Sequence, residues 1–595
     1  MQGIQDMLGY ERLTQLLPTM KLDGLVITAI LCGCGAGILL RKWLLRRQLR
    51  KKIAKAQEQR ARLLEQMKTA VHRFKHKHAD IQPESILSLS LLELSEKLRE
   101  GALSPENVLY TYMEQALKVN KELNCLTDFI PDCEEQLKEL PKGKEKGLLY
   151  GVPVSLKEHF DYKNHVSSCG LVSFLGIPAK DDCVIVRVLK SQGAIPFVKT
   201  NVPQTMISYD SSNVIFGKTL HPQNPKKSPG GSSSGEGALI AGGGSILGLG
   251  SDVGGSIRIP SSFCGICGFK PTGSRLSLLG MSVPVDGMDT VTAALGPMAR
   301  DVDSLALCMR ALLCEELFHL DPSVPPLSFN DEVYSSSKPL RIGYYESDGF
   351  SQPTPSMKRA IQQTKQLLEK AGHKLIPFSV PRTDHMVYEL FFGGVFADGI
   401  ETLHDVLKNE MIDPCISYLF KLSSYPAFIK QILSFLLKPM VPRLAKFLEK
   451  TCGVGSVKKL WKQQYALKTY QREFIDKWKS LELDVILCPA VCPAFNSASS
   501  GILLGVTSYT FLYNVLNFPA GIVPVGTVTK EDEEELKQYR GYYHDFWDTT
   551  LRKTVEGGVG LPTAVQCVAL PWRDELCLRL MKEVETVTQE RRRHK

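Results

Sequence analysis

Glycine and serine crowd two loops within residues 228–275, one around Ser232 and the other around Ser256. A helix-like stretch, 235–242, and an apolar run, 246–249, separate the two loops. Glycine tolerates positive φ and lets the backbone approach a ligand closely, so consecutive backbone N–H groups can converge on one point. The predicted donors of such an oxyanion hole are Val253, Gly254, Gly255 and Ser256. The block therefore favours a pair of ligand-binding loops in which a serine is the nucleophile.

A nucleophilic serine needs a base, and histidine is the usual partner. Residues 231–235 match the GxSxG pattern, but the preceding KKSPGG is poor strand sequence, so a nucleophile elbow is not expected there. His159 is the best histidine candidate, and for it we expect a structural or supporting role. Cys264 and Cys267 have the spacing of a metal or redox pair, yet their surroundings are apolar and we expect them to pack. No metal and no cofactor are expected.

The chain as a whole alternates helix-like and strand-like segments. Helices are expected at 88–99, 104–119 and 184–191, and strands at 148–156 and 194–199. Hydrophobic residues make up 43% and charged residues 23% of the 595 residues, which excludes disordered, collagen-like and coiled-coil chains. We therefore predict an α/β fold.

An uncharged, largely apolar segment lies at residues 24–40. Arg12 and Lys21 are the basic residues before it, whereas seven lysines and arginines follow within residues 41–52. Because basic residues stay on the cytoplasmic side, we expect a transmembrane anchor at 24–40, a non-cytosolic segment at 1–23 and a cytosol-facing body. A cleaved signal peptide is the alternative, although its charges would precede the apolar run.

The net charge of +9 is concentrated in one place. Residues 41–77 hold 14 Lys and Arg against two Glu, which leaves the rest of the chain slightly acidic. A nucleic-acid-binding protein usually spreads basic residues over its folded face, so no nucleic-acid partner is expected. We interpret residues 41–78 as a basic helical linker at a membrane surface, or alternatively a solvated spacer helix, followed by a catalytic body at 79–595.

Residues 416–450 form a second unusual segment, in which basic residues interrupt many apolar ones at helical intervals. The basic residues are Lys421, Lys430, Lys438, Arg443, Lys446 and Lys450. Pro426, Pro439 and Pro442 divide the segment into short helices. The pattern is typical of amphipathic helices lying in a membrane interface with their basic side toward the headgroups. A buried helical insertion or a dimer surface is the alternative.

Several ordered blocks of this chain resemble the amidase signature family. They are GVPVSLKEHFD (151–161), GGSSSGEGA (230–238), SDVGGSIRIPSSFCGICGFKPT (251–272), GPMARDVDSL (296–305), FPAGIVPV (518–525) and GLPTAVQCVALPW (560–572). The similarity covers roughly residues 90–595, and it places a lysine and two serines at the family's positions. One glycine-rich loop alone is weak evidence, whereas these blocks together identify the chain as a member of the family.

The resemblance implies a Ser-Ser-Lys triad: Ser256 as nucleophile, neutral Lys157 as base, and Ser232 as the proton bridge between them. It also implies a cis peptide at Gly231–Ser232 and a large, twisted mixed sheet flanked by helices. We interpret Asp252 and Arg258 as supports of the nucleophile loop. A free lysine, with a pKa of about 10.4, is a poor base at pH 7, so the triad requires burial that favours the neutral amine.

Within the family, the apolar amino-terminal segment, residues 416–450 and the closing blocks resemble the membrane-bound animal members that cleave fatty-acid amides. This resemblance implies N-acylethanolamines and primary fatty amides as substrates, a helical membrane-binding cap at 416–450, and a homodimer. For an anchored protein with a cytosol-facing body, the expected location is the endoplasmic reticulum or another endomembrane. Met206, Ile207 and Tyr209 match positions that the family uses near the substrate. The chain departs from the pattern at Ser234, where glycine is common.

Three alternatives to this function remain. One is a general or short-chain amidase or esterase of the same family. Another is a subunit that releases ammonia from glutamine for a transamidating partner, although such a subunit would carry no anchor. The last is an inactive, membrane-tethered scaffold, although all three triad residues are present.

Overall fold

The computed structural model describes residues 24–78, 81–143, 146–497, 499, 501 and 503–593, apart from the side chains of residues 24–33 and 504. The chain divides into two compact units, residues 1–54 and 55–595.

The described part of the first unit is helical and belongs to α2 (Gly24–Lys77). The segment predicted at 1–23 lies outside the described residues, and the span predicted at 24–40 falls mostly on residues whose side chains are not described. Among the residues that were described, no helix is sufficiently long and apolar to cross a membrane.

The second unit begins inside the basic helix rather than at residue 79. Met67, Ala70 and Val71, at helical spacing on α2, are buried in the main core. Gln57 donates a hydrogen bond to the Ile215 carbonyl at 2.8 Å. The carboxyl-terminal part of the predicted linker is therefore a packed element of the body and not a solvated spacer.

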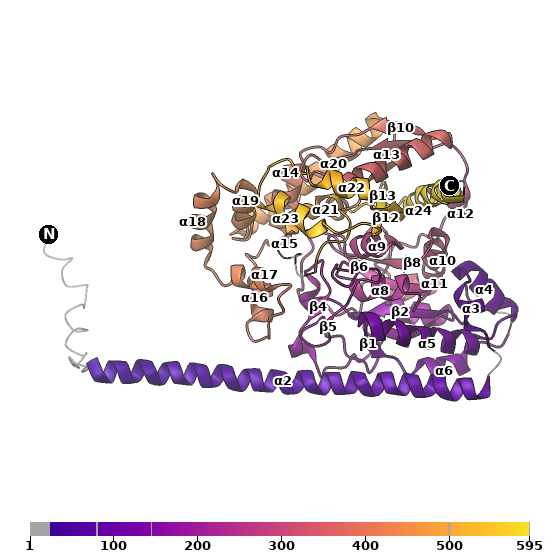
Figure 1. Cartoon of the computed structure of the whole chain (residues 1–595), viewed down its shortest axis with the longest axis horizontal. Helices are drawn as coiled ribbons and strands as arrows, with labels where there is room; N and C mark the ends of the chain where they lie inside the picture. Colours follow the sequence, from indigo (N-terminus) through magenta and orange to yellow (C-terminus); the bar gives the residue numbers. More distant parts are fainter. Residues whose placement is uncertain are drawn as a thin grey trace. The chain divides into compact units, whose positions relative to one another are not determined.

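Within the part of the chain that the structure describes, eleven strands form one mixed sheet in the order β1-β3-β2-β6-β8-β7-β12-β13-β11-β9-β10. The strands are β1 (Leu126–Phe129), β2 (Pro153–Lys157), β3 (Ile195–Thr200), β6 (Leu247–Asp252), β7 (Cys267–Lys270), β8 (Ala294–Ala299), β9 (Arg341–Tyr344), β10 (Lys374–Pro377), β11 (Val485–Pro489), β12 (Ala520–Thr527) and β13 (Pro562–Ala569). A small hairpin, β4 (Ser212–Asn213) and β5 (Gly217–Lys218), stands apart from the sheet. Figure 1 shows the sheet running from β1 at the bottom to β10 at the top. The predicted α/β class and mixed sheet are confirmed.

Helices fill the connections between the strands and pack on the sheet. They are α3 (Pro83–Leu87), α4 (Leu91–Glu100), α5 (Pro105–Leu123), α6 (Cys133–Glu139), α7 (Val184–Ser191), α8 (Ser234–Ala241), α9 (Arg258–Cys264), α10 (Val302–Leu312), α11 (Glu315–Leu320), α12 (Asp331–Ser335), α13 (Pro355–Lys370), α14 (Thr383–His385), α15 (Gly393–Val395), α16 (Glu401–Leu407), α17 (Ser417–Ser423), α18 (Ala427–Leu437), α19 (Pro442–Lys450), α20 (Val457–Ser480), α21 (Ser508–Val515), α22 (Lys530–Leu536), α23 (Phe546–Val555) and α24 (Asp574–Arg593). A π-helical stretch, Met386–Phe392, lies between α14 and α15.

Local signals explain several of these boundaries. The Ser104 hydroxyl accepts a hydrogen bond from the Glu106 N–H at 3.2 Å and caps α5, with proline next to it in the first turn. The strand predicted at 148–156 is shorter than expected, because Gly151 adopts φ +72° in a turn just before β2.

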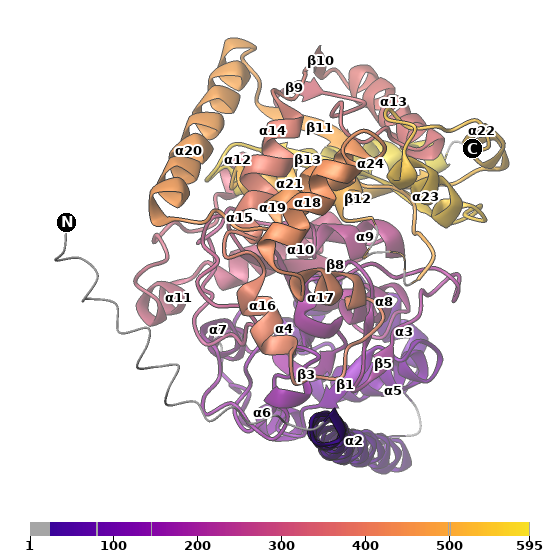
Figure 2. The ribbon, with the colours of Figure 1, turned by 90° about the vertical axis from the view of Figure 1, so that its left-hand side faces the viewer.

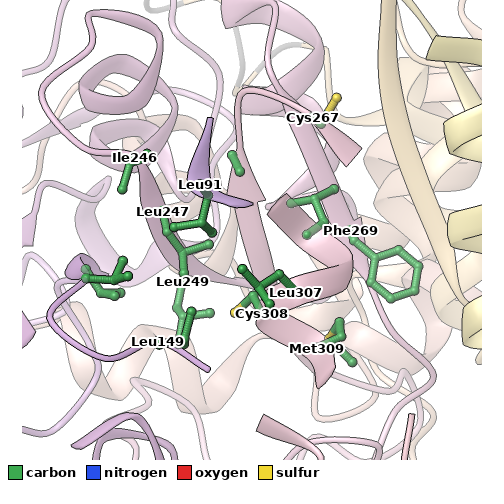
Figure 3. Close-up of a cluster of buried hydrophobic side chains, with 14 of the residues drawn as sticks. Leu91, Leu149, Ile246, Leu247, Leu249, Cys267, Phe269, Leu307, Cys308 and Met309 are labelled. Carbon is green, nitrogen blue, oxygen red and sulfur yellow. The ribbon is translucent and has the colours of Figure 1, made fainter. Parts of the chain in front are cut away.

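The core beside the end of β6 follows from the alternation of leucine and glycine along this strand. Leu247 and Leu249 are buried in one cluster with Leu91 of α4 and Leu307 of α10 (Figure 3). Successive side chains of a strand point to opposite faces, so Gly248, between the two leucines, belongs to the other face of the sheet. That face receives α8, which packs against β2, β3 and β6.

The segment 416–450 forms the three short helices α17, α18 and α19, which stand at the front of Figure 2. On α18 the polar Lys430 and Ser434 are buried, whereas Phe428 and Phe435 are 62% and 77% exposed. The expectation that the basic side of this segment faces outward is wrong for Lys430 and Arg443. Both are buried because protein acceptors hold their charges, and α18 presents its apolar side instead.

Candidate active site

Two neighbouring parallel strands bring the site together. β2 ends at Lys157 and β6 ends at Asp252, and the two strands pair with Leu156 opposite Leu249. Ends of adjacent parallel strands meet at the same edge of a sheet. The loop before α8 carries Ser232, and the loop between β6 and α9 carries Ser256.

Lys157 is fully buried and its amine contacts hydroxyl groups. Its Nζ donates to Ser232 Oγ at 2.8 Å and to Ser251 Oγ at 2.9 Å. Burial lowers the pKa of Lys157 to about 7, and the nearby Asp252 carboxylate opposes that shift. At neutral pH a substantial fraction of this amine is therefore unprotonated and able to accept a proton.

The two predicted serines lie on loops that are tied to each other. The Ser233 N–H donates to the Ser256 carbonyl at 3.1 Å. Ser232 and Ser256 both line the same cavity, and the peptide between Gly231 and Ser232 is cis. The structure thus brings Lys157, Ser232 and Ser256 to one place.

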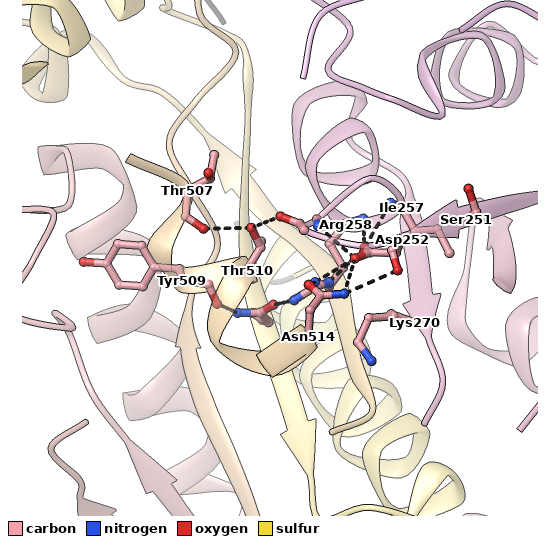
Figure 4. Close-up of polar contacts among 12 residues, drawn as sticks. Ser251, Asp252, Ile257, Arg258, Lys270, Thr507, Tyr509, Thr510 and Asn514 are labelled. Atoms are coloured by element: carbon pink, nitrogen blue, oxygen red, sulfur yellow. Dashed lines mark hydrogen bonds and ion pairs between the residues drawn. The ribbon is translucent and has the colours of Figure 1, made fainter. Parts of the chain in front are cut away.

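The loop of the expected oxyanion hole is held by neighbouring groups. Gly255 has φ +125°, and a Cβ there would lie 2.6 Å from Thr510 Oγ1, so only glycine fits. Thr510 Oγ1 donates to the Gly254 carbonyl at 2.7 Å (Figure 4). The Gly255 N–H already donates to Asp252 Oδ1 at 2.8 Å. Of the four predicted donors, Gly255 therefore holds the loop's shape, and Val253, Gly254 and Ser256 are the better candidates.

Asp252 and Arg258 form a fully buried ion pair behind this loop, as Figure 4 shows. Arg258 Nε and Nη2 lie 3.0 and 2.9 Å from the two carboxylate oxygens. Burial alone would raise the pKa of Asp252, but the guanidinium and backbone N–H groups bring it well below its usual range. Arg258 also donates to Gln566 Oε1 at 2.8 Å and to Asn514 Oδ1 at 2.6 Å. Asp252 therefore stays an anion and Arg258 a cation. This suits residues that support the nucleophile loop rather than residues that carry a proton.

The cavity beside the serines is largely apolar and has a volume of about 200 Å³. Met206, Ile207 and Tyr209 all line it, as the sequence predicts. Further apolar lining comes from Leu278, Met281, Val283, Pro284, Val285, Met288, Phe391, Phe392, Val395 and Phe396. An apolar cavity with a few polar groups at one place is the usual form of a small-molecule site.

His159 also lines the cavity and is buried. Its Nδ1 lies 3.1 Å from the Ser282 carbonyl, which accepts the Nδ1 proton, and burial lowers the pKa of His159 well below its ordinary value. The ring is therefore neutral. Within the described part of the chain, no hydrogen bond joins its ring to Ser232 or Ser256.

Two residues singled out by the sequence have other partners. The extra hydroxyl, Ser234 Oγ, donates to the Asn201 carbonyl at 3.1 Å rather than to Lys157. Cys264 is buried with its Sγ 3.3 Å from the Pro229 carbonyl, and Cys267 is buried in the main core. Across the residues described, no group of three or more metal-ligating side chains occurs.

Sequence reasoning missed Ser251, which shares the Lys157 amine with Ser232. It also missed Glu236, a fully buried carboxyl on α8. A signal for Glu236 exists, since it is the one charged residue between Lys227 and Asp252. A single charged residue in an otherwise uncharged, buried segment indicates that this group has a specific polar partner.

Comparison with known proteins agrees with this geometry. Residues 107–578 match the Amidase family. Fatty-acid amide hydrolase 1 of Sus scrofa is 51% identical over 557 residues, which cover 94% of this chain and 96% of that protein. The vitamin D3 hydroxylase-associated protein of Gallus gallus is 58% identical over 457 residues, 77% of this chain and 98% of that protein.

A solved structure of a fatty acid amide hydrolase superposes with a TM-score of 0.76 at 26% identity, covering 90% of this chain and 95% of that one. The sequence resemblance is thereby confirmed over most of the chain's length. With its mixed sheet, its two glycine-serine loops and this match over residues 107–578, the chain belongs to the amidase signature family.

Proposed function

We propose that this protein hydrolyses fatty-acid amides, namely N-acylethanolamines and primary fatty amides, to the fatty acid and the amine or ammonia. The observation that carries the proposal is the 2.8 Å contact between Lys157 Nζ and Ser232 Oγ, beside an apolar cavity that Ser256 also lines. The names of the Sus scrofa relative and of the solved neighbour support the same substrate class.

In the proposed mechanism, neutral Lys157 accepts a proton from Ser232 as Ser232 accepts the proton of Ser256. Ser256 Oγ bonds to the amide carbonyl carbon, and backbone N–H groups of Val253, Gly254 and Ser256 stabilise the oxyanion. The proton returns through Ser232 to the leaving nitrogen as the C–N bond breaks. Water then attacks the acyl-Ser256 ester by the same proton path, which releases the fatty acid and restores the serine.

Hydrolysis of ethanolamides with acyl chains from acetyl to icosanoyl, measured in detergent, tests the substrate class. Rates that rise steeply with chain length are expected, because the cavity walls are apolar and each buried methylene contributes about 0.8 kcal/mol. Fast cleavage of short amides without a chain preference would indicate a general amidase. If none of these ethanolamides is cleaved, the result would favour the inactive, membrane-tethered scaffold.

We also propose that the protein is held at a membrane by the anchor at 24–40 and by the outer side of α18, with a cytosol-facing body on the endoplasmic reticulum or another endomembrane. Exposed Phe428, Ile432, Phe435, Leu436 and Met440 support the second contact. Alkaline carbonate extraction of cell membranes tests the anchor, and release of the full chain into the supernatant would contradict it.

A homodimer is the assembly implied by the family resemblance, and we propose it here. Light scattering of the detergent-solubilised chain at several concentrations tests it. A mass corresponding to one chain at every concentration would rule it out.

A further inference from the structure

Glu236 lies on the face of the sheet that carries Lys157. Its carboxylate accepts hydrogen bonds from Ser155 Oγ at 2.6 Å and from Thr200 Oγ1 at 2.7 Å. Ser155 is two residues before Lys157 on β2, so the two side chains share a face. Thr200 on β3 is the register partner of Lys157.

The socket around this carboxylate spans three adjacent strands. Gly248 on β6 is the register partner of Ser155, and a Cβ there would lie 1.9 Å from Glu236 Oε2. Only a glycine at this place leaves room for the carboxylate. Ser155 on β2, Thr200 on β3 and Gly248 on β6 thus form a site built for one buried carboxyl group on α8.

When the Lys157 amine is neutral, an ionised Glu236 has no cation to balance it. Asp252 is matched by Arg258 in a close ion pair. Glu236, in contrast, has hydroxyl partners and no ion pair among the described side chains, while its field acts on Lys157. A buried carboxylate without a cation is unfavourable, and it becomes favourable when a cation forms nearby.

We infer that Glu236 is a positioning residue for the reaction, whose carboxylate supplies the buried counter-charge to the ammonium that Lys157 becomes each time it accepts the nucleophile's proton. The inference rests on the proposed function, in which Lys157 cycles between amine and ammonium. No proton passes through Glu236 in this scheme. Its hydroxyl partners hold the carboxylate in place, and its charge acts through Lys157.

Other titratable groups face this pair from the surrounding elements. Asp252 and the Cys169 thiol also act on Lys157, and the Cys125 thiol faces Glu236. His159 feels the Lys157 charge but stays neutral. Burial raises the pKa of Cys125 to about 12 and that of Cys169 well above its ordinary value, so neither thiol carries charge at neutral pH. Burial raises the pKa of Glu236 to about 7, while the Ser155 and Thr200 hydroxyls and the Lys157 charge lower it, so the Glu236 carboxylate is favoured when Lys157 becomes an ammonium.

Glu236→Gln tests the inference because it removes the charge and keeps the shape. A carboxylate near Lys157 favours the ammonium, so its loss makes the amine easier to deprotonate. We expect the acid limb of the kcat/KM–pH profile on a long-chain ethanolamide to move down by about one pH unit. At the plateau, kcat falls about tenfold, because the transient ammonium loses its counter-charge.

Ser155→Ala is the second variant, in case Glu236→Gln does not fold. It removes one of the two hydroxyls that stabilise the carboxylate anion, so it moves the acid limb in the same direction by a smaller amount. Asp348→Asn is the matched control. Asp348 is also a buried carboxyl held by a hydroxyl, that of Ser508, and by backbone N–H groups, but its charge does not act on Lys157.

An acid limb that stays in place in both Glu236→Gln and Ser155→Ala, even with a lower melting temperature or lower kcat, overturns the inference and leaves Glu236 a structural group. A control that moves the limb as far also overturns it. A wild-type enzyme that cleaves no amide overturns the proposed function and this inference with it, whereas an active wild type with an unmoved limb overturns the inference alone.

Discussion

Lys157 at the end of β2 and Lys430 on α18 are both buried lysines, but the acceptors around them differ in kind. Lys157 donates to the hydroxyls of Ser232 and Ser251 at 2.8 and 2.9 Å, and at a longer 3.4 Å to the Ser251 carbonyl. Lys430 donates to the backbone carbonyls of Gly399 and Thr451. Burial lowers the pKa of both lysines, to about 7 for Lys157.

This difference separates Lys157, which can exchange a proton with its partners, from Lys430, which holds parts of the fold together. A hydroxyl both accepts and donates a hydrogen bond, so a proton can leave or reach Lys157 through Ser232. A carbonyl only accepts hydrogen bonds, so the partners of Lys430 favour its ammonium form and cannot relay its proton. Lys430 instead joins α18 to the segments around Gly399 and Thr451, with the apolar side of α18 left outward.

The largest effect should come from Lys157→Ala. Loss of the base should slow amide hydrolysis by about 10²–10⁴-fold. Ester hydrolysis should fall less, because an alkoxide leaves without the protonation that nitrogen needs. Paired rates on an amide and an ester with the same acyl chain measure this. An unchanged amide rate would remove Lys157 from the mechanism, and thermal unfolding confirms that the variant is folded.

Lys430→Ala should leave the chemistry intact and weaken the cap. The buried Thr451 carbonyl and the partly buried Gly399 carbonyl lose this donor, which costs about 1–3 kcal/mol. The melting temperature should fall, or α18 should become sensitive to protease, while kcat on a short soluble amide stays the same. The exposed Lys421→Ala, on α17, is the control and should change neither. A loss of activity as large as that of Lys157→Ala would erase the distinction between the two lysines.

The pH dependence should carry the signature of Lys157. Below about pH 7 the rate should fall about tenfold per unit, because the base becomes protonated. The free energy of unfolding changes with pH in the direction opposite to that of a lysine whose ammonium is stabilised by folding. Between the folded pKa of about 7 and the ordinary 10.5, the unfolded chain binds more protons, so the free energy of unfolding gains about 1.4 kcal/mol per pH unit from this group.

Lys157→Met should lack this gain. Denaturant unfolding of the wild type and the variant at several pH values between 7 and 10 measures the difference in free energy. Parallel stability curves for the two proteins would contradict a lowered pKa at Lys157.

The smallest effect concerns the outer side of α18. Phe435 is 77% exposed, so Phe435→Ser should leave the melting temperature unchanged. Binding to phospholipid vesicles should weaken by a contribution of about 1 kcal/mol, the value of a partly buried aromatic side chain. Leu327→Ser, which removes an exposed apolar side chain outside the cap, is the control. Equal vesicle binding by both variants would argue against docking through α18.

Local pattern was sufficient for much of the architecture. The Ser104-Pro105 signal opens α5, residues 184–191 form α7 as predicted, and the prolines of 416–450 separate α17, α18 and α19. These features depend on neighbours in sequence, such as caps, proline geometry and spacing of apolar residues. For the same reason the pattern misjudged Lys430, because amphipathic spacing shows that a helix has two sides and not which one faces inward.

The order of amino acids is enough to predict the residue types of the site and the loops that carry them: Lys157 after a strand, and Ser232 and Ser256 in glycine-rich loops. Which neighbours act on these residues depends on how the strands are arranged in the folded chain. Ser155, Thr200 and Gly248 are far apart in the chain, and they surround Glu236 because β3, β2 and β6 are adjacent in the sheet. Strand order is set by packing over the whole body, so no local pattern contains it.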